Sequence, residues 1–174
     1  NGMQLPTGEV TLMETLRQAG YRTCGIGKMH FGPQWAFPRE SSGGLRNPGP
    51  DMALDPQPRP DQFPWYGFEE ALITEDHRVG PYGRYLAEHG LDVWADPHSF
   101  TYPQHLTQRS AYPLEHHQTT WIAERSLDFL ERQGTERPFF LWTSFVHPHH
   151  PFTPPAPYDT LYDPNAMPLP VWSE

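Results

Sequence analysis

The stretch TLMETLRQAGYRTCGIGKMHFG, residues 11–32, decides the fold that this sequence predicts. Thr11 and Glu14 fit a capping box, in which two side chains satisfy each other's free backbone N–H groups at a helix start. Apolar residues then recur at helical spacing, and Gly20 suits a left-handed helix end. The small and β-branched residues 21–27 indicate a strand. The predicted order is therefore helix, strand and a glycine-rich loop.

The same order recurs in the second half of the chain. Residues 119–134 predict an amphipathic helix that begins at Thr119 or Thr120 and ends at Gly134. The apolar run PFFLWTSFV, residues 138–146, is typical of a strand buried on both faces of a parallel sheet. A histidine-bearing loop follows it. Two such units predict an α/β fold, with a mostly parallel sheet flanked by helices.

The middle of the chain is rich in proline, glycine and polar residues, and we interpret residues 33–117 as a long Pro/Gly-rich insertion. Only residues 82–90 predict a helix there. We expect one partial domain over residues 1–174, composed of a helix–strand unit at 1–32, this insertion, and a second unit at 118–174.

The composition limits the partners of the chain. A net charge of -9 argues against nucleic acid and against an anionic membrane surface, since both need a basic footprint. No apolar run approaches the roughly 18 residues of a spanning helix. A small anionic substrate remains compatible, because a local cationic pocket can oppose the overall field. A single cysteine leaves the cellular compartment open.

Lys28 is the only lysine of the chain and lies in the loop GIGKMHFG, two positions before His30. A lysine supplies a compact point charge, whereas arginine supplies a rigid planar fork. In an extended backbone, residues two apart point to the same side, so both side chains could address one ligand. Neighbouring glycines would let the backbone approach closely. The alternative is a solvated lysine beside a loop histidine.

His147, His149 and His150 form a second candidate cluster. Such a cluster could bind a transition metal such as zinc, although further ligands would have to come from distant segments. Alternatively, one of these histidines could act as a general acid or bind an oxyanion, because the pKa of histidine lies near neutrality. Ordinary loop histidines are the third interpretation.

Three other chemically suggestive positions favour structural roles. Cys24 lies inside a predicted buried strand and has no evident base beside it, so we expect a buried structural cysteine. Glu69 and Glu70 are adjacent and point apart, so a solvated stretch is favoured over an acid–base pair. His116 and His117 precede a predicted helix and are also interpreted as structural.

Taken together, these segments resemble the type I sulfatase family of the alkaline-phosphatase-like superfamily. Residues 11–32 are similar to the family's threonine-capped helix, AGY-T turn and GK-H-G loop. YGFEE at residues 66–70 also matches, and residues 119–164 resemble the unit that ends in PH-PF. The resemblance implies part of a sulfatase fold.

The resemblance also implies roles for particular residues. Lys28 would bind a sulfate oxygen, His30 would contact a formylglycine hydroxyl, and His149 would bind sulfate or aid departure of the leaving group. The family's nucleophile is a formylglycine made from the cysteine of a C-x-P-S-R motif, which this chain lacks. Cys24, in TCGIGK, does not fit that motif. The main acidic ligands of the family's divalent cation, usually calcium, are also missing, and we assign no metal ligand.

The sequence thus predicts an internal segment of a sulfatase that hydrolyses small anionic sulfate esters. The nucleophile and cation would come from parts outside this chain, so the chain alone should be inactive. A phosphonate monoester or phosphodiester hydrolase of the same superfamily is the alternative enzyme. A non-catalytic, His-rich metal-binding module is the alternative of another class. The organic group of the ester stays open.

Overall fold

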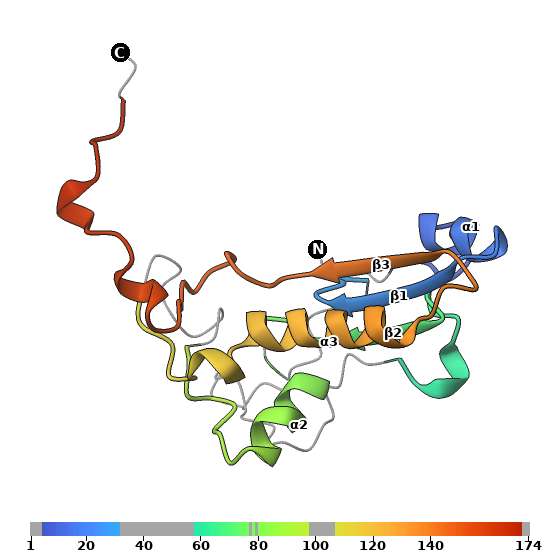
Figure 1. The fold of residues 1–174 in the computed structure, drawn as a ribbon, viewed down its shortest axis with the longest axis horizontal. Helices are drawn as coiled ribbons and strands as arrows, with labels where there is room; N and C mark the ends of the chain where they lie inside the picture. Colours follow the sequence, from blue (N-terminus) through green and yellow to red (C-terminus); the bar gives the residue numbers. More distant parts are fainter. Residues whose placement is uncertain (1–4, 32–57, 77, 79, 98–106, 172–174) are drawn as a thin grey trace, which may run out of the picture.

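A three-stranded parallel sheet forms the centre of the described part of the chain. The computed structural model describes residues 5–31, 58–76, 78, 80–97 and 107–171. Its strands are β1 (Arg22–Gly27), β2 (Glu70–Ile73) and β3 (Phe139–Ser144), in the order β2-β1-β3. Both pairings of β1 are parallel. The three strands therefore end at the same edge of the sheet (Figure 1).

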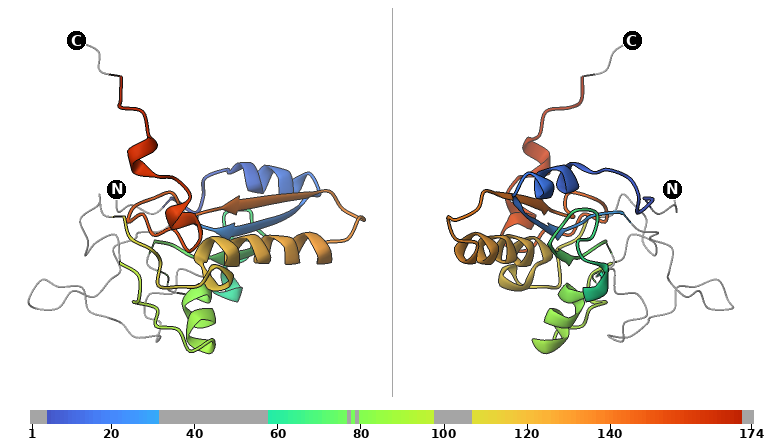
Figure 2. Two further views of the ribbon diagram at one scale, coloured as in Figure 1. Left: turned by 60° about the vertical axis from the view of Figure 1, so that its left-hand side comes forward. Right: turned by 90° about the vertical axis from the view of Figure 1, so that its right-hand side faces the viewer.

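Helices cover both faces of this sheet. Helix α1 (Leu12–Gln18) lies against one face, and α3 (Gln118–Arg132) lies against the other (Figures 1 and 2). Helix α2 (Pro81–Glu88) packs beside β2 on the side of α3. Short 3-10 turns connect the larger elements at Pro60–Gln62, Leu114–His116, Tyr158–Thr160 and Pro164–Ala166. The layers are helix, sheet and helix.

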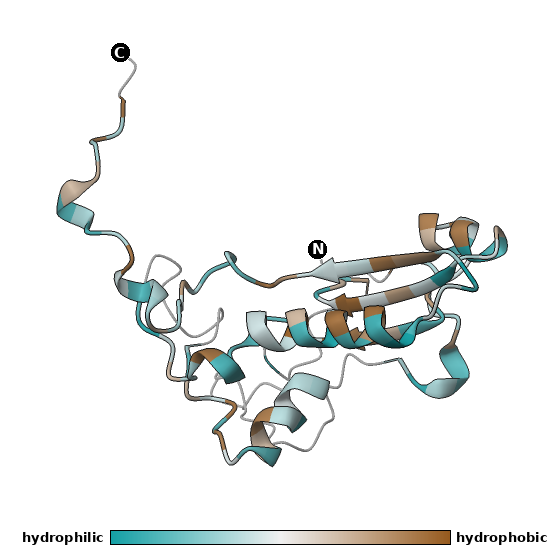
Figure 3. Cartoon of the chain, in the orientation of Figure 1, coloured by the Kyte–Doolittle hydropathy of each residue, from teal (hydrophilic) through white to brown (hydrophobic). Residues whose placement is uncertain are grey.

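The alternating side chains of β1 divide the core into two clusters. Cys24 and Ile26 are fully buried and pack with Ile122 and Phe129 of α3. The other cluster lies on the side of α1 and contains Met13, Met29, Phe68, Ala71 and Ile73. Figure 3 shows hydrophobic residues along β3 giving way to hydrophilic ones at its carboxyl end. Of the three described strands, β3 is the one that ends in polar residues, Thr143 and Ser144, and these are half-buried.

The predicted α/β fold with a parallel, helix-flanked sheet is confirmed, but one strand was missed. Glu69 is exposed and Glu70 half-buried, so the two do reach solvent as interpreted, but Glu70 also begins β2 and forms ion pairs with Arg22 and Arg132. The pair EE hid a short strand whose residues alternate between half-buried and buried. Residues 33–117 therefore contribute β2 and α2 to the fold, while their boundaries as an insertion stay a prediction.

The helix caps differ in part from their predictions. Thr11 caps α1 by accepting a hydrogen bond from the backbone N–H of Glu14 at 3.0 Å. The Glu14 carboxylate, however, accepts hydrogen bonds from Arg17, so the reciprocal half of the capping box is replaced by an ion pair. Helix α3 is capped by His117 rather than by a threonine, because the His117 Nδ1 accepts from the Thr119 N–H. Helices α1 and α3 thus each have a side-chain acceptor at their start, whereas α2 begins after Gly80 and has none.

The prediction that β3 is buried on both faces was wrong. Phe139 and Trp142 are exposed, and the remaining residues of β3 are only half-buried. The reason is position, since β3 is an edge strand of the described sheet and pairs there with β1 alone. A near-continuous apolar run gives no information on whether a neighbouring strand covers it.

Among the described helices, none combines the length and apolar character needed to cross a membrane.

Gly27 closes β1 and makes the sharpest backbone contact of the sheet edge. Its φ of +100° lies in the left-handed region, which costs side-chain-bearing residues free energy. A Cβ at this position would lie 1.9 Å from the carbonyl oxygen of Ser144 at the end of β3. The next residue, Lys28, donates its backbone N–H to that same oxygen at 3.0 Å. Gly27 therefore sets where the lysine leaves the sheet.

Replacement of Gly27 by alanine should destabilise the fold. The clash involves backbone on both sides and cannot be relieved by a side-chain rotation, so we expect Gly27→Ala to lower the free energy of unfolding by more than about 2 kcal/mol. Gly8→Ala is the matched control, because nothing lies within 4 Å of its added Cβ. Urea unfolding followed by circular dichroism measures both. Equal stabilities of the two variants would contradict the role assigned to Gly27.

Candidate active site

Lys28 stands at the carboxyl end of β1 with its ammonium against an acidic side chain. The Nζ atom donates to Asp76 Oδ1 at 2.7 Å and to Asp76 Oδ2 at 3.0 Å. The two side chains are mostly buried, at 14% and 7% exposure for the lysine and the aspartate. An ammonium has three N–H donors, so this pairing occupies two and leaves one for a ligand.

Asp76 leaves β2 three residues after that strand ends, and the main chain around it is fixed by α3. The side-chain amide of Gln118, at the start of α3, donates to Thr74 Oγ1 at 2.8 Å and to the Glu75 carbonyl at 3.0 Å. Gln118 itself is only 2% exposed. The helix thus anchors the segment that carries the acid.

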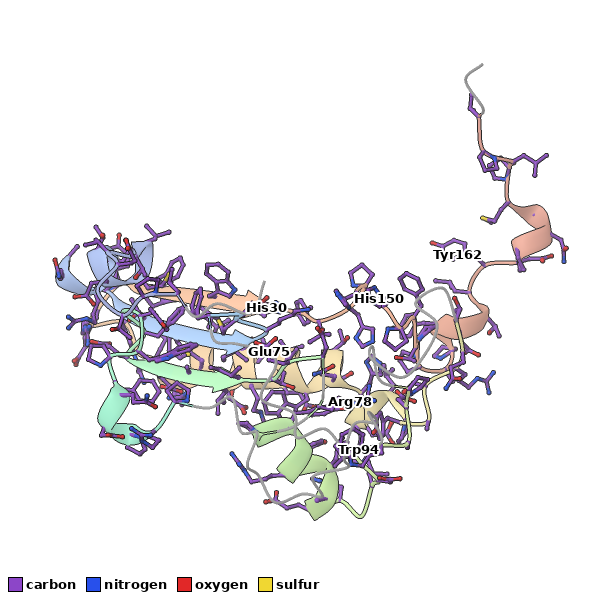
Figure 4. The ribbon with its side chains drawn as sticks, turned by 180° about the vertical axis from the view of Figure 1, so that it is seen from behind. His30, Glu75, Arg78, Trp94, His150 and Tyr162 are labelled. Carbon is purple, nitrogen blue, oxygen red and sulfur yellow. The ribbon has the colours of Figure 1, made fainter. Side chains whose placement is uncertain are left out.

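Glu75 holds the loop that follows Lys28. Its Oε1 accepts the backbone N–H groups of Met29 at 3.1 Å and of His30 at 3.0 Å. These contacts hold His30 at a φ of 55°, an uncommon conformation for a residue with a side chain. The side chain of His30 is exposed, and Figure 4 shows it beside Glu75 where the strands end. The structure therefore fixes the main chain of His30 at the sheet edge.

His149 reaches the same carboxylate from the loop after β3. Its Nδ1 lies 3.9 Å from Asp76 Oδ1, and its side chain is 38% exposed. The Nδ1 atom also lies 2.6 Å from the carbonyl oxygen of His150, which can only accept, so Nδ1 carries a proton. Nε2 is then the atom left for a ligand or for proton transfer. The two rings stack with centroids 4.1 Å apart.

His147 turns inward from the same loop and packs on the buried N-cap of α3. Its ring centroid is 4.9 Å from that of His117, and both rings contact Thr153. Burial lowers the pKa of His147 to about 4, assisted by the neighbouring His117 and Arg78. Burial also lowers the pKa of His117. Both histidines are therefore neutral structural groups near pH 7.

Cys24 lies in the core below the site, as expected for a structural cysteine. It is completely buried in β1, and burial raises the pKa of its thiol to about 12. A thiol with that pKa is not a nucleophile near neutral pH. Gly25 and Gly27 serve packing inside the sheet, whereas Gly32 lies outside the described residues.

The structure brings two of the three predicted site residues to one point. Lys28 and His149 both face the same oxygen of Asp76, although they are more than a hundred positions apart in the sequence. His30 lies on the same edge, and its contact there is through the backbone. The catalytic roles of these residues stay predictions.

Sequence reasoning missed Asp76 and Glu75, the two acids that organise the site. Both lie within three residues of the end of EALI, and a short apolar segment followed by polar residues is the signal that could have found them. That signal was hidden because Glu69 and Glu70 made the segment resemble a solvated turn. Because β2 was not predicted, the two acids that follow it were not predicted as site residues either.

The described residues do not fit the cation or the nucleophile that the resemblance implies. Calcium takes 6–8 oxygen ligands, whereas the nearby carboxylate of Asp76 holds an ammonium and that of Glu75 holds backbone N–H groups. Within the described segments, no three His, Cys, Asp or Glu side chains could hold a metal ion together. This also gives no support there to a metal site built on His147, His149 and His150.

The features above are an α/β fold with a parallel sheet, and a lysine and a histidine that face one carboxylate at the carboxyl edge of that sheet. The Sulfatase family profile matches residues 2–168. The chain belongs to the sulfatase family.

Curated relatives agree with this placement. The chain is 28% identical over 174 residues to an arylsulfatase of Clostridium perfringens, covering 95% of this chain and 32% of the relative. It is 29% identical to a sulfatase of Formosa agariphila, covering 94% and 26%. It is 31% identical over 116 residues to the multifunctional alkaline phosphatase superfamily protein PehA of Trinickia caryophylli, covering 62% and 22%. The chain thus spans a third or less of these relatives.

Solved structures show the same fold. A phosphonate monoester hydrolase from Silicibacter pomeroyi superposes with a TM-score of 0.61 at 25% identity, covering 98% of this chain and 32% of that one. A phosphonate monoester hydrolase of Agrobacterium radiobacter gives a TM-score of 0.61 at 21% identity, covering 97% and 31%.

Acid should destabilise the fold through the buried histidines. The pKa of His147 is lowered from 6.5 to about 4, so the unfolded chain binds more protons than the folded one between those values. The free energy of unfolding should therefore be highest above about pH 6.5 and should fall by about 2 kcal/mol by pH 5.

Urea unfolding between pH 7.5 and 5 measures this effect. His147→Gln should remove most of the pH slope, whereas His89→Gln, at an exposed position, should leave it unchanged. A slope that survives in His147→Gln would assign the acid sensitivity to other groups.

Proposed function

We propose that this chain forms the anion-binding wall of a sulfatase that hydrolyses small sulfate monoesters. One observation carries the proposal: Lys28 and His149 converge on a single carboxylate oxygen at the carboxyl edge of a parallel sheet. Ligands of α/β proteins bind at this edge. A carboxylate oxygen and a sulfate oxygen offer the same kind of acceptor to an ammonium and an imidazolium.

Each residue has a role that its geometry supports. Lys28 would direct its remaining N–H at a non-bridging sulfate oxygen, where a preorganised donor stabilises the charge that develops in the transition state. His149, protonated on Nε2, would supply the proton that the departing alcohol oxygen needs when the S–O bond breaks. His30 would present its exposed ring from the rigid loop held by Glu75. Hydrolysis then consumes one water and releases an alcohol and sulfate.

The nucleophile and the cation belong to the proposal only as components outside this chain. The family resemblance implies a formylglycine nucleophile and a divalent cation such as calcium. The described residues supply neither, since Cys24 is buried and inert. The substrate would be a small anionic ester, with no nucleic acid and no membrane as partner.

A phosphonate monoester hydrolase is the second candidate. It is favoured by the Silicibacter pomeroyi enzyme, which superposes over 98% of this chain. Both kinds of ester present a tetrahedral, singly charged group to the same wall. Because charge and shape are shared, a difference between the affinities for the two esters would show which ester the site favours.

Ligand binding to the purified chain tests the proposed site. We expect phenyl sulfate to bind with a dissociation constant of roughly 1–10 mM, as suits part of a site. His149→Ala should weaken binding about tenfold, the usual effect of losing a charged hydrogen bond. His89→Ala is the matched control, because His89 is an exposed histidine at the end of α2. NMR titration of the histidine ring signals measures the dissociation constants of the wild-type chain and of the two variants.

Two further arms sharpen this test. Lys28→Arg keeps the charge and the partner Asp76 but replaces a point donor by a fork, so affinity should fall about tenfold. Phenyl methylphosphonate binds more tightly than phenyl sulfate if the second candidate is right. Unchanged affinity in both His149→Ala and Lys28→Arg would overturn the site assignment.

The purified chain should not turn over an aryl sulfate. Its sequence holds no C-x-P-S-R motif, and its one cysteine is buried with a pKa raised to about 12. We expect release of 4-nitrophenol from its sulfate ester to stay at the buffer rate from pH 6 to 9. Turnover that disappears in Lys28→Arg would contradict this and place a complete active site in the chain.

A further inference from the structure

Asp76 is placed where it meets every anion that Lys28 and His149 would bind. Its Oδ1 is 2.7 Å from the Lys28 ammonium and 3.9 Å from the His149 ring. Only 7% of its side chain is exposed, so solvent screens its charge poorly. An anion held by the remaining donors of Lys28 and His149 must lie within a few ångströms of this carboxylate.

The position of Asp76 is fixed from two sides. Gln118 of α3 holds the preceding residues Thr74 and Glu75, and Glu75 is tied to the backbone of the loop after Lys28. The carboxylate itself is gripped through both oxygens. It therefore cannot swing away when a ligand arrives without breaking a mostly buried ion pair.

The ion pair leaves the lysine with little net positive charge to offer. Lys28 is the only lysine of the chain, and Asp76 cancels its charge at 2.7 Å. Arg78 is committed elsewhere, because its guanidinium donates to the carbonyl oxygens of Val93, Asp96 and Pro97. Lys28 and His149 can still donate hydrogen bonds to a ligand, but the positive charge of Lys28 is largely cancelled by Asp76.

Such a site discriminates by ligand charge. Both the attraction by Lys28 and the repulsion by Asp76 double when the ligand is a dianion rather than a monoanion, so Asp76 cancels the advantage that the lysine alone would give to a dianion. Sulfate monoesters and phosphonate monoesters carry one negative charge. Phosphate monoesters have a second pKa near 6 and carry close to two at pH 8.

We propose that Asp76 is a specificity-determining residue that makes this site select singly charged esters over doubly charged phosphate monoesters. The inference rests on the proposed function, since it concerns the same anion site. It adds a residue that the resemblance to sulfatases did not supply, and it assigns a function to the acid that pairs with Lys28.

The test compares two ligands that differ mainly in charge. The purified 174-residue chain is titrated at pH 8 with phenyl sulfate and with phenyl phosphate, and the histidine ring signals are followed by NMR. The wild-type chain should bind phenyl sulfate more tightly. Asp76→Asn keeps the shape and an acceptor for Lys28, and it should shift the ratio of the two affinities toward phenyl phosphate by about tenfold or more.

Two variants control for other causes. Asp76→Glu keeps the charge and should keep a preference for phenyl sulfate, which a purely steric role would not ensure. Asp61→Asn removes one negative charge from an exposed ion pair with Arg59 and should leave the ratio unchanged. Circular dichroism checks each fold, and Asp76→Ser replaces Asp76→Asn if that variant does not fold.

The outcomes separate this inference from the proposed function. Binding of neither ligand by the wild-type chain overturns the anion site and the inference with it. Binding of phenyl sulfate that needs His149, with the same ligand ratio in wild type and Asp76→Asn, overturns the inference alone. A shift of equal size in Asp61→Asn does so too, because it would reflect total charge.

Discussion

The site depends on the parallel register of β1 between its two neighbours. Gly27 pairs with Ile73 of β2 and with Ser144 of β3, so all three strands stop at one level. Parallel strands deliver their following loops to the same edge. Lysine, aspartate and histidine thus meet although each comes from a different part of the sequence. An antiparallel β2 would have sent Asp76 to the opposite edge.

The buried polar groups behind this edge explain why it keeps its shape. Gln118 bonds the main chain that leaves β2, and Glu75 bonds the main chain that follows β1. The neutral His117 caps α3 and contacts Thr153 in the loop that follows β3. The first residues of α3 therefore connect the segment after β2 with the histidine-bearing loop after β3, and Glu75 connects the segment after β2 with the one after β1. Each link pairs a buried polar atom, as low-dielectric surroundings require.

Local signals carried the prediction of the two helix–strand units and of Lys28, whereas His149 was singled out from its cluster by the resemblance of its loop to the PH-PF motif. Helical spacing, the glycine at the end of the first helix and the apolar run before the histidines are all read from neighbours in sequence, and Gly20 indeed has a φ of +91°. Asp76 could not be found in that way. Its importance comes from a contact 48 positions away, and the four-residue strand before it begins with a glutamate and follows another. The exposure of β3 was equally hidden, because covering a strand is a property of its neighbours.

The outer side of β3 has a consequence for how the chain behaves in solution. An edge strand carrying exposed Phe139 and Trp142 is a template on which another chain can add a strand. A net charge of -9 opposes such encounters between copies. Salt shortens the reach of that repulsion to about 8 Å at physiological ionic strength. Added salt therefore weakens the repulsion that opposes pairing of this exposed edge with a second copy of the chain.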